Sequence, residues 1–210
     1  MEDGIEFSYM IDGKVYTEKT KLLIGADGAF SKVRNEFFSK VKKPKEYAAI
    51  QEWYRVEKPD AYYYGFADEN VCDFYSWIIP KENYLILGSS IDDMKHANEK
   101  FEVLKNDLKR YGFNFTSDNF VKKEGSILFR PTSMRQIALG DGNVALIGEA
   151  AGIISPSSSE GIGYAIRCGA CMAECLNENL DEGIKKYCKK AKKIARHAVR
   201  KKYRSFFLYK

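Results

Sequence analysis

The stretch ALIGEAAGIISPSSSEGIGYAI, residues 145–166, decides the fold because it joins three kinds of local structure in one short run. Its apolar start predicts a strand buried on both faces, and the small residues after it predict a tight turn. After a loop, a helix is predicted to begin at glycines. A helix start offers backbone N–H groups and partial positive charge, and Gly161 and Gly163 let a flat ligand approach the backbone. The run indicates a site for an anionic or electron-rich ligand, unless its glycines serve packing alone.

A second run of similar order, LLIGADGAFSKVRNEF, occupies residues 22–37. An apolar strand ends in a turn that contains Gly25, Asp27 and Gly28. A helical segment follows, in which Ser31 and Arg34 lie about one turn apart. Two buried strands that each open onto a glycine turn predict one layered α/β unit.

The rest of the chain predicts a second sheet, which is antiparallel. Strand-like alternation on both sides of Asp12-Gly13 first predicts a hairpin. Four strand-like segments then follow one another between residues 47 and 92 without a helix, and a further strand covers residues 125–130. A helix over residues 92–110 should cover this sheet, because apolar residues recur there at helical spacing. These residues are Met94, Ala97, Phe101, Leu104 and Leu108. Two more helices are predicted over residues 161–180 and 184–207.

This order of elements predicts an α/β fold with an α+β insertion. Residues 1–43 and 132–180 form one domain, which residues 44–131 interrupt as an antiparallel-sheet domain. A basic helix, residues 181–210, ends the chain.

Composition narrows the class of protein. At 210 residues with 45% hydrophobic residues, the chain can fill a real core. It has no apolar run of membrane-spanning length and no signal-peptide pattern at its start, so we expect a cytoplasmic protein. Five scattered cysteines do not form a disulfide framework, and we expect them to be reduced core residues rather than metal ligands.

The net charge of +5 is unevenly distributed. Residues 185–210 carry twelve Lys and Arg and no acid, which leaves −7 for the rest of the chain. A nucleic-acid-binding domain spreads basic residues over a folded face, so this class is disfavoured. The basic helix also has an apolar face, which fits a helix docked on the protein; contact with an anionic membrane surface is the alternative left open.

The two glycine runs resemble motifs of a known family. GADGAFSKVR is similar to the Asp-Gly motif of the flavin-dependent oxidoreductases of the aromatic-hydroxylase superfamily, and LIGEAAGIISPSSSEGIGYAI is similar to its later Gly-Asp motif. YSWIIPKENYLILGSS resembles the geranylgeranyl reductase-like branch through Tyr75, Trp77, Pro80 and Gly88. An ordinary buried aromatic strand also explains this third stretch.

The resemblance implies a partial FAD-binding, Rossmann-like domain with an inserted substrate domain. It implies reduction of double bonds in an apolar, isoprenoid-like substrate by hydride transfer from the flavin. The helix beginning near Glu160 would face the flavin N1 edge, and Arg34 would bind phosphate. Tyr75, Trp77 and Pro80 would line the substrate pocket. The implied cofactor-binding residues are Gly25, Asp27, Gly28, Arg34, Gly148, Glu149, Gly152, Pro156, Gly161, Ile162 and Gly163.

Two departures from the family pattern keep alternatives open. The Gly-x-Gly-x-x-Gly turn that holds the FAD pyrophosphate is absent, so a separate N-terminal piece is an expected partner. Glu149 stands where the motif has Asp, which puts its bond to the ribityl chain in doubt. The alternatives are a flavin-dependent monooxygenase and a degenerate, partner-binding relative. No catalytic residue is predicted, and we expect His96 and His197 to be solvated.

Overall fold

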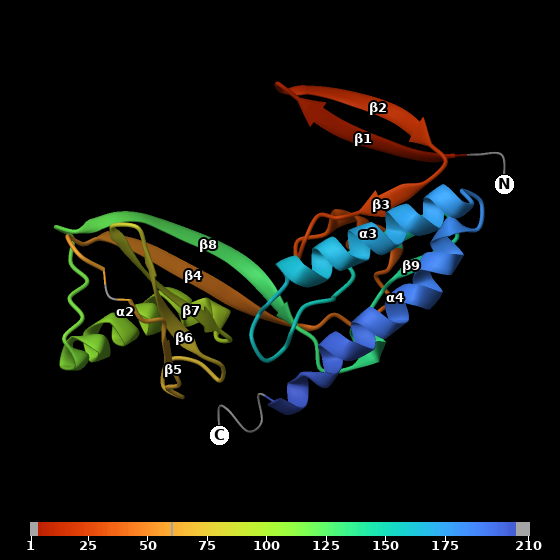
Figure 1. The fold of residues 1–210 in the computed structure, drawn as a ribbon. Coiled ribbons are helices and arrows are strands. Elements are labelled where there is room, and N and C mark those ends of the chain that lie inside the picture. Colours follow the sequence, from red (N-terminus) through yellow and green to blue (C-terminus); the bar gives the residue numbers. More distant parts are fainter. Residues whose placement is uncertain (1–3, 60, 205–210) are drawn as a thin grey trace. The chain divides into compact units, whose positions relative to one another are not determined.

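A computed structural model describes residues 4–59 and 61–204 of the chain (Figure 1). The chain forms two compact units, each with its own hydrophobic core. The first unit combines residues up to Pro44 with Pro131–Lys202, and the second contains Lys45–Arg130. Before Lys202, the chain passes between the units beside Pro44 and again beside Pro131.

The chain begins with an antiparallel hairpin of β1 (Ile5–Ile11) and β2 (Lys14–Thr20). Asp12 and Gly13 connect the strands with φ angles of 49° and 76°. A two-residue turn with both φ angles positive matches the right-handed twist of the strands. This confirms the hairpin predicted from Asp12-Gly13.

The first unit also contains a three-stranded sheet in the order β3 (Leu23–Gly25), β10 (Val144–Leu146) and β9 (Gly140–Asp141). β3 and β10 are parallel, although the whole second unit lies between them in sequence. The residues of β10 are at most 6% exposed, which confirms the prediction of a fully buried strand.

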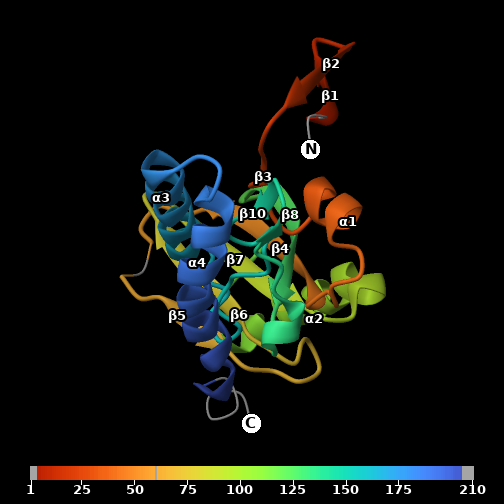
Figure 2. The same ribbon diagram turned by 90° about the vertical axis from the view of Figure 1, so that its right-hand side faces the viewer.

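Two long helices, α3 (Ile162–Glu178) and α4 (Gly183–Arg200), lie side by side in the first unit (Figures 1 and 2). Their facing sides join the core that also contains β10. Cys168 and Cys175 are fully buried in it, as expected for core residues. α4 ends at Arg200, and the predicted helix end at Phe207 lies outside the described residues. The short α1 (Lys32–Phe37) and a 3-10 turn, η3 (Met134–Gln136), complete this unit.

The second unit is a five-stranded sheet in which all neighbouring strands are antiparallel, as predicted. The strand order is β5 (Tyr64–Phe66), β6 (Ser76–Lys81), β7 (Tyr84–Ile91), β4 (Lys45–Arg55) and β8 (Phe120–Arg130). β8 begins five residues earlier than the strand predicted at residue 125, since its exposed first half, which includes the charged residues 122–124, also pairs with β4.

One helix, α2 (Ala97–Leu108), packs on this sheet, with the 3-10 turns η1 (Met94–His96) and η2 (Lys109–Tyr111) at its ends. Phe101, Leu104 and Leu108 are at most 2% exposed and share a core with the sheet. Met94 differs from the prediction, because it lies in η1 and is 41% exposed.

Candidate functional site

The first glycine turn is built by close packing at the end of β3. A Cβ on Gly25 would lie 2.6 Å from Leu146 Cδ2 and 2.8 Å from Val33 Cβ, so only glycine fits between the strand and α1. Gly28 has a φ of +67°, which glycine adopts without strain, and no atom lies within 4 Å of the place its Cβ would occupy. Gly25 therefore serves packing, whereas Gly28 leaves open space beside the turn.

Asp27 stabilises the start of α1. Its Oδ2 accepts hydrogen bonds from the backbone N–H groups of Lys32 (2.7 Å) and Val33 (3.3 Å). The Ser31 hydroxyl accepts from the Arg34 N–H at 2.9 Å, which completes the cap. The Asp27 side chain is nevertheless on the surface, where a ligand could also reach it.

Arg34 has a different role from the phosphate binding implied by the resemblance. Its side chain is 1% exposed, and burial lowers the pKa of the guanidinium from its ordinary value. Nη1 donates to the Ala150 carbonyl at 3.1 Å, and Nη2 donates to the Gln136 carbonyl at 2.8 Å. Arg34 is thus directed into the protein, where it joins α1 to the second glycine turn and to η3.

The second glycine turn follows β10 and requires two left-handed residues. Gly148 has a φ of +57°, and its Cβ would lie 2.9 Å from the Cβ of Ala165 on α3. Gly152 has a φ of +81°, and its Cβ would lie 3.0 Å from the Gln136 carbonyl. The Gly152 N–H donates to the Glu149 carbonyl at 2.8 Å, so Glu149 lies within the tight turn itself. Any larger residue at either glycine would force the turn away from α3 or η3.

The chain then runs through a buried loop to the start of α3. Pro156 is buried in this loop, and Gly161 is the residue that precedes the helix. No side chain caps this helix start. The first N–H groups of any α-helix lack partners within the helix, so they can bind a ligand. A Cβ on Gly161 would only reach ordinary contact with Ile154, at 3.6 Å, so the glycine is not needed for packing.

The two glycine turns lie together because β3 and β10 are parallel neighbours. The Ile147 N–H donates to the Gly25 carbonyl at 3.0 Å where the two strands end, and the bond from Arg34 to the Ala150 carbonyl adds a second link between the turns. Both turns thus lie at the carboxyl ends of adjacent parallel strands, which is the usual position of ligand sites in α/β sheets.

The three residues predicted to line a substrate pocket do not share one face. Tyr75 and Trp77 lie on one face of the sheet, with their rings 5.6 Å apart. Pro80 lies on the opposite face, because successive strand residues alternate. Pro80 therefore lies on a different surface from Tyr75 and Trp77, and the substrate pocket itself stays a prediction.

Gly88 belongs to the same face as Trp77, its partner on β7. A Cβ on Gly88 would lie 2.3 to 2.5 Å from three atoms of the indole, so the ring lies flat against the β7 backbone. Trp77 Nε1 and Ser90 Oγ are buried on this face and have no hydrogen-bond partner among the residues that the structure describes. This face thus combines aromatic surface with two unused polar groups.

The two histidines, His96 and His197, have different surroundings. His96 is exposed and pairs with Asp93 at 2.9 Å, which raises the pKa of its ring. His197 is also exposed, but its Nδ1 lies 3.1 Å from the hydroxyl of Tyr164, a residue in the first turn of α3 that is 2% exposed. Sequence reasoning missed this pair, because it depends on the antiparallel packing of α3 against α4.

Comparison with solved structures defines the fold. A geranylgeranyl bacteriochlorophyll reductase-like protein from Thermoplasma acidophilum covers 99% of this chain and 53% of its own, with a TM-score of 0.72 and 18% identity. The flavin-dependent halogenase CmlS covers 93% of this chain and 38% of its own, with a TM-score of 0.65 and 15% identity. The match to Klebsiella pneumoniae HpxO, solved with FAD and uric acid, covers 96% of this chain and 55% of HpxO, with a TM-score of 0.57 and 17% identity. The chain therefore has the fold of FAD-dependent oxidoreductases, which confirms the fold class and, at the level of the fold, the resemblance.

In sequence, the chain is similar to the CbrA proteins. CbrA of Escherichia coli O9:H4 (strain HS) is 35% identical over 165 residues, which make up 79% of this chain and 44% of that protein. CbrA of Shigella flexneri serotype 5b (strain 8401) is 36% identical over the same length. The chain spans less than half the length of these curated relatives. No family profile matches it. Within the described residues, none of the helices is long and apolar enough to cross a membrane.

Proposed function

We propose that this chain forms the flavin-facing part of an FAD-dependent oxidoreductase. The observation that carries the proposal is the meeting of two glycine turns at the carboxyl ends of β3 and β10, beside a helix start with no side-chain cap. When bound, FAD supplies hydride transfer. The protein groups that would hold it are the surface carboxylate of Asp27, the open backbone at Gly28, and the first N–H groups of α3 at Gly161–Gly163.

Three of the other predicted cofactor residues have an indirect role in this proposal. Gly25, Gly148 and Gly152 are close-packed, so they would shape the turns rather than contact the flavin. Arg34 would act in the same way, through the two carbonyls that it binds. Ile162 is 80% exposed beside the helix start, where it could cover one side of a flat ring.

We further propose that the substrate is apolar, isoprenoid-like, and reduced at a double bond. Support comes from the Trp77 face of the sheet, where the indole lies on Gly88 and Tyr75 lies next to it. Apolar and aromatic surfaces with a few polar groups are typical of small-molecule sites. The reductase-like neighbour in structure favours the same substrate class.

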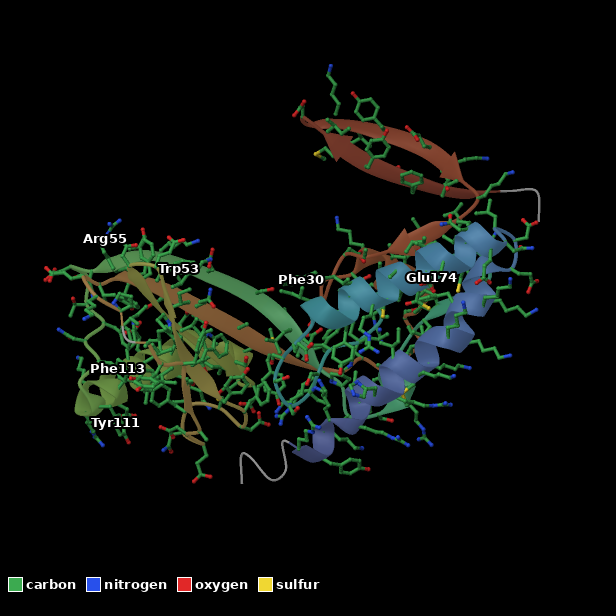
Figure 3. All side chains as sticks on the ribbon, viewed as in Figure 1. Phe30, Trp53, Arg55, Tyr111, Phe113 and Glu174 are labelled. Carbon is green, nitrogen blue, oxygen red and sulfur yellow. The ribbon has the colours of Figure 1, made fainter. Side chains whose placement is uncertain are left out.

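A further segment of chain is part of this proposal. β3 lies at the edge of its sheet within the described residues, and Ile162 and Ile166 are 80% and 67% exposed on α3. Phe30, after the first glycine turn, is 63% exposed (Figure 3). An open strand edge beside exposed apolar side chains favours addition of another strand and helix. The relatives, which are more than twice as long as the matched region, contain chain that could supply them.

Flavin titration tests the proposal. The purified chain is mixed with FAD, alone and with the portion of E. coli CbrA outside the matched residues, and bound flavin is measured by absorbance after gel filtration. Gly161→Val should abolish binding with little loss of stability, because its Cβ would make only ordinary contact with Ile154 while the side chain would block a ligand at the backbone. Gly65→Val is the matched control, since a Cβ at Gly65 has no neighbour within 4 Å and the residue belongs to the second unit. Equal binding by both variants, or no yellow complex in either mixture, would refute the proposal and favour the degenerate, partner-binding relative.

A monooxygenase is the second candidate, because the same fold is found in PqsL from Pseudomonas aeruginosa, a probable FAD-dependent monooxygenase. The two reactions differ in their need for oxygen. A reductase should turn over anaerobically, whereas a monooxygenase should consume oxygen in step with product formation.

A further inference from the structure

Four polar side chains connect the start of α3 with the end of α4. Lys201 Nζ lies 3.2 Å from Glu160 Oε2 and 5.1 Å from the ring centroid of Tyr164. The Tyr164 hydroxyl in turn lies 3.1 Å from His197 Nδ1, one helical turn before Lys201. We call these four residues the helix-start cluster.

Two members of the helix-start cluster, Tyr164 and Lys201, are largely buried. Tyr164 is 2% exposed and the Lys201 side chain is 19% exposed, while the Glu160 side chain, at 52%, faces solvent on one side. A hydrogen bond to Tyr164 raises the pKa of Lys201, and the bond to Glu160 adds to this effect, against the lowering caused by burial. Lys201 therefore remains a cation held between two specific partners.

Glu160 links the cluster to the glycines of the helix start. Its Oε1 lies 2.8 Å from the place where a Cβ on Gly163 would stand, so the carboxylate packs against the side of Gly163 that a side chain would otherwise occupy. Its backbone carbonyl accepts from the Ser155 N–H at 3.0 Å, which ties the same residue to the loop. Without Lys201 this carboxylate could swing across the first turn of α3 and repel an anionic or electron-rich ligand, so holding it against Gly163 keeps the turn open.

We propose that Lys201 is a positioning residue for the flavin site: it holds the Glu160 carboxylate over Gly163 and, with His197, fixes Tyr164 beneath the first turn of α3. This inference rests on the proposed function. It gives the end of the basic helix a task in the cofactor site. The helix end acts through Glu160 and Tyr164 and contacts no reacting atom.

Hydrogen exchange of the flavin-free protein is the first test. Lys201→Met should raise amide exchange over residues 159–165 about three- to tenfold, because a partly buried ion pair and a hydrogen bond that hold this turn are lost. Lys201→Arg should restore most of the protection. Lys193→Met, an exposed lysine on the same helix, is the control and should leave exchange unchanged. Tyr164→Phe keeps the ring but removes the hydroxyl, and should raise exchange in the same residues. Exchange in Lys201→Met equal to that in the control would overturn the inference.

The second test is an FAD titration. It uses the chain alone or the chain mixed with the CbrA portion, whichever binds FAD in the wild type. Lys201→Met should weaken binding about three- to tenfold, and Lys201→Arg should recover it. Wild-type affinity in Lys201→Met would overturn the inference but leave the proposed function standing. A wild type that binds no FAD, combined with altered exchange, would refute the proposed function and leave Lys201 a structural residue, which also overturns the inference.

Discussion

Replacing Arg34 with methionine should destabilise the first unit and leave the second unit intact. The substitution keeps most of the apolar stem but removes both Nη donors, so the carbonyls of Ala150 and Gln136 lose their bonds at 3.1 and 2.8 Å. A hydrogen bond to a charged group contributes about 1.5 to 3 kcal/mol, and a buried acceptor without a partner costs about as much. Allowing for partial repair by water, we expect a loss of about 3 to 5 kcal/mol.

Two spectroscopic probes separate the units in this experiment. Both tryptophans, Trp53 and Trp77, belong to the second unit, so their fluorescence follows its unfolding. The far-ultraviolet circular dichroism is dominated by α3 and α4, which have 17 and 18 residues against 12 in α2. With a urea slope of about 1 to 3 kcal/mol/M, the circular dichroism midpoint should fall by about 1 to 5 M, and the fluorescence midpoint should change little.

Arg135→Met is the matched control, because Arg135 is exposed and lies next to Gln136 on η3. Arg34→Lys should recover only part of the stability, since one ammonium group cannot reproduce the planar fork that reaches two carbonyls. A circular dichroism midpoint for Arg34→Met equal to that of the control would refute the clamp role. If the fluorescence midpoint of Arg34→Met fell together with its circular dichroism midpoint, the two units would not unfold independently.

Three further predictions concern single positions. Gly88→Ala should displace the Trp77 indole, because the new Cβ would lie 2.3 Å from it. The stability of the second unit should fall by about 1 to 3 kcal/mol, and the tryptophan emission should shift. An unchanged emission spectrum would contradict the packing of Trp77 on Gly88. Ser159→Gly should raise the thermal midpoint slightly, by about 1 kcal/mol or less in stability, because Ser159 has a φ of +50°; a lower midpoint would contradict this. Burial alone would raise the pKa of Glu52, but hydrogen bonds from Tyr54 and Lys105 lower the pKa overall. The stabilisation that the Glu52 carboxylate provides is therefore present above the ordinary pKa of 4.5, and it is lost as the pH falls through the lowered pKa. Glu52→Gln should therefore lower the urea midpoint at pH 7, and the gap to the wild type should narrow in acid; a constant gap would exclude this contribution.

Elements that depend on local patterns could be predicted from the sequence. The Asp12-Gly13 hairpin, the buried strand after residue 143 and the helix over the antiparallel sheet all follow from spacing within a few residues. The two glycine runs also predicted the two turns after β3 and β10, where the candidate site is proposed. Their neighbouring position follows from the pairing of β3 with β10, which a layered α/β unit requires.

The roles of individual side chains depended on contacts that spacing does not contain. Arg34 binds carbonyls more than a hundred residues away, so nothing near it in sequence distinguished a clamp from a phosphate ligand. The contact of Tyr164 with His197 likewise depends on how α3 and α4 align. Pro80 is a different case. Strand alternation already separates it from Tyr75 and Trp77, but the motif was treated as one surface.

The basic helix shows why an amphipathic pattern alone does not identify what covers its apolar face. In α4 that face is buried in the first unit, and three of its residues, Ala191, Ala195 and Ala198, are fully buried. Alanine offers little area to a bilayer, whereas amphipathic helices at membrane surfaces carry Trp, Phe or Leu. Small residues instead let two helices approach closely, which is what α3 and α4 do. The size of the apolar residues, which is readable in the sequence, thus favoured the docked helix over the membrane alternative. It also explains how the end of α4 comes close enough to the start of α3 for Lys201 to reach Glu160.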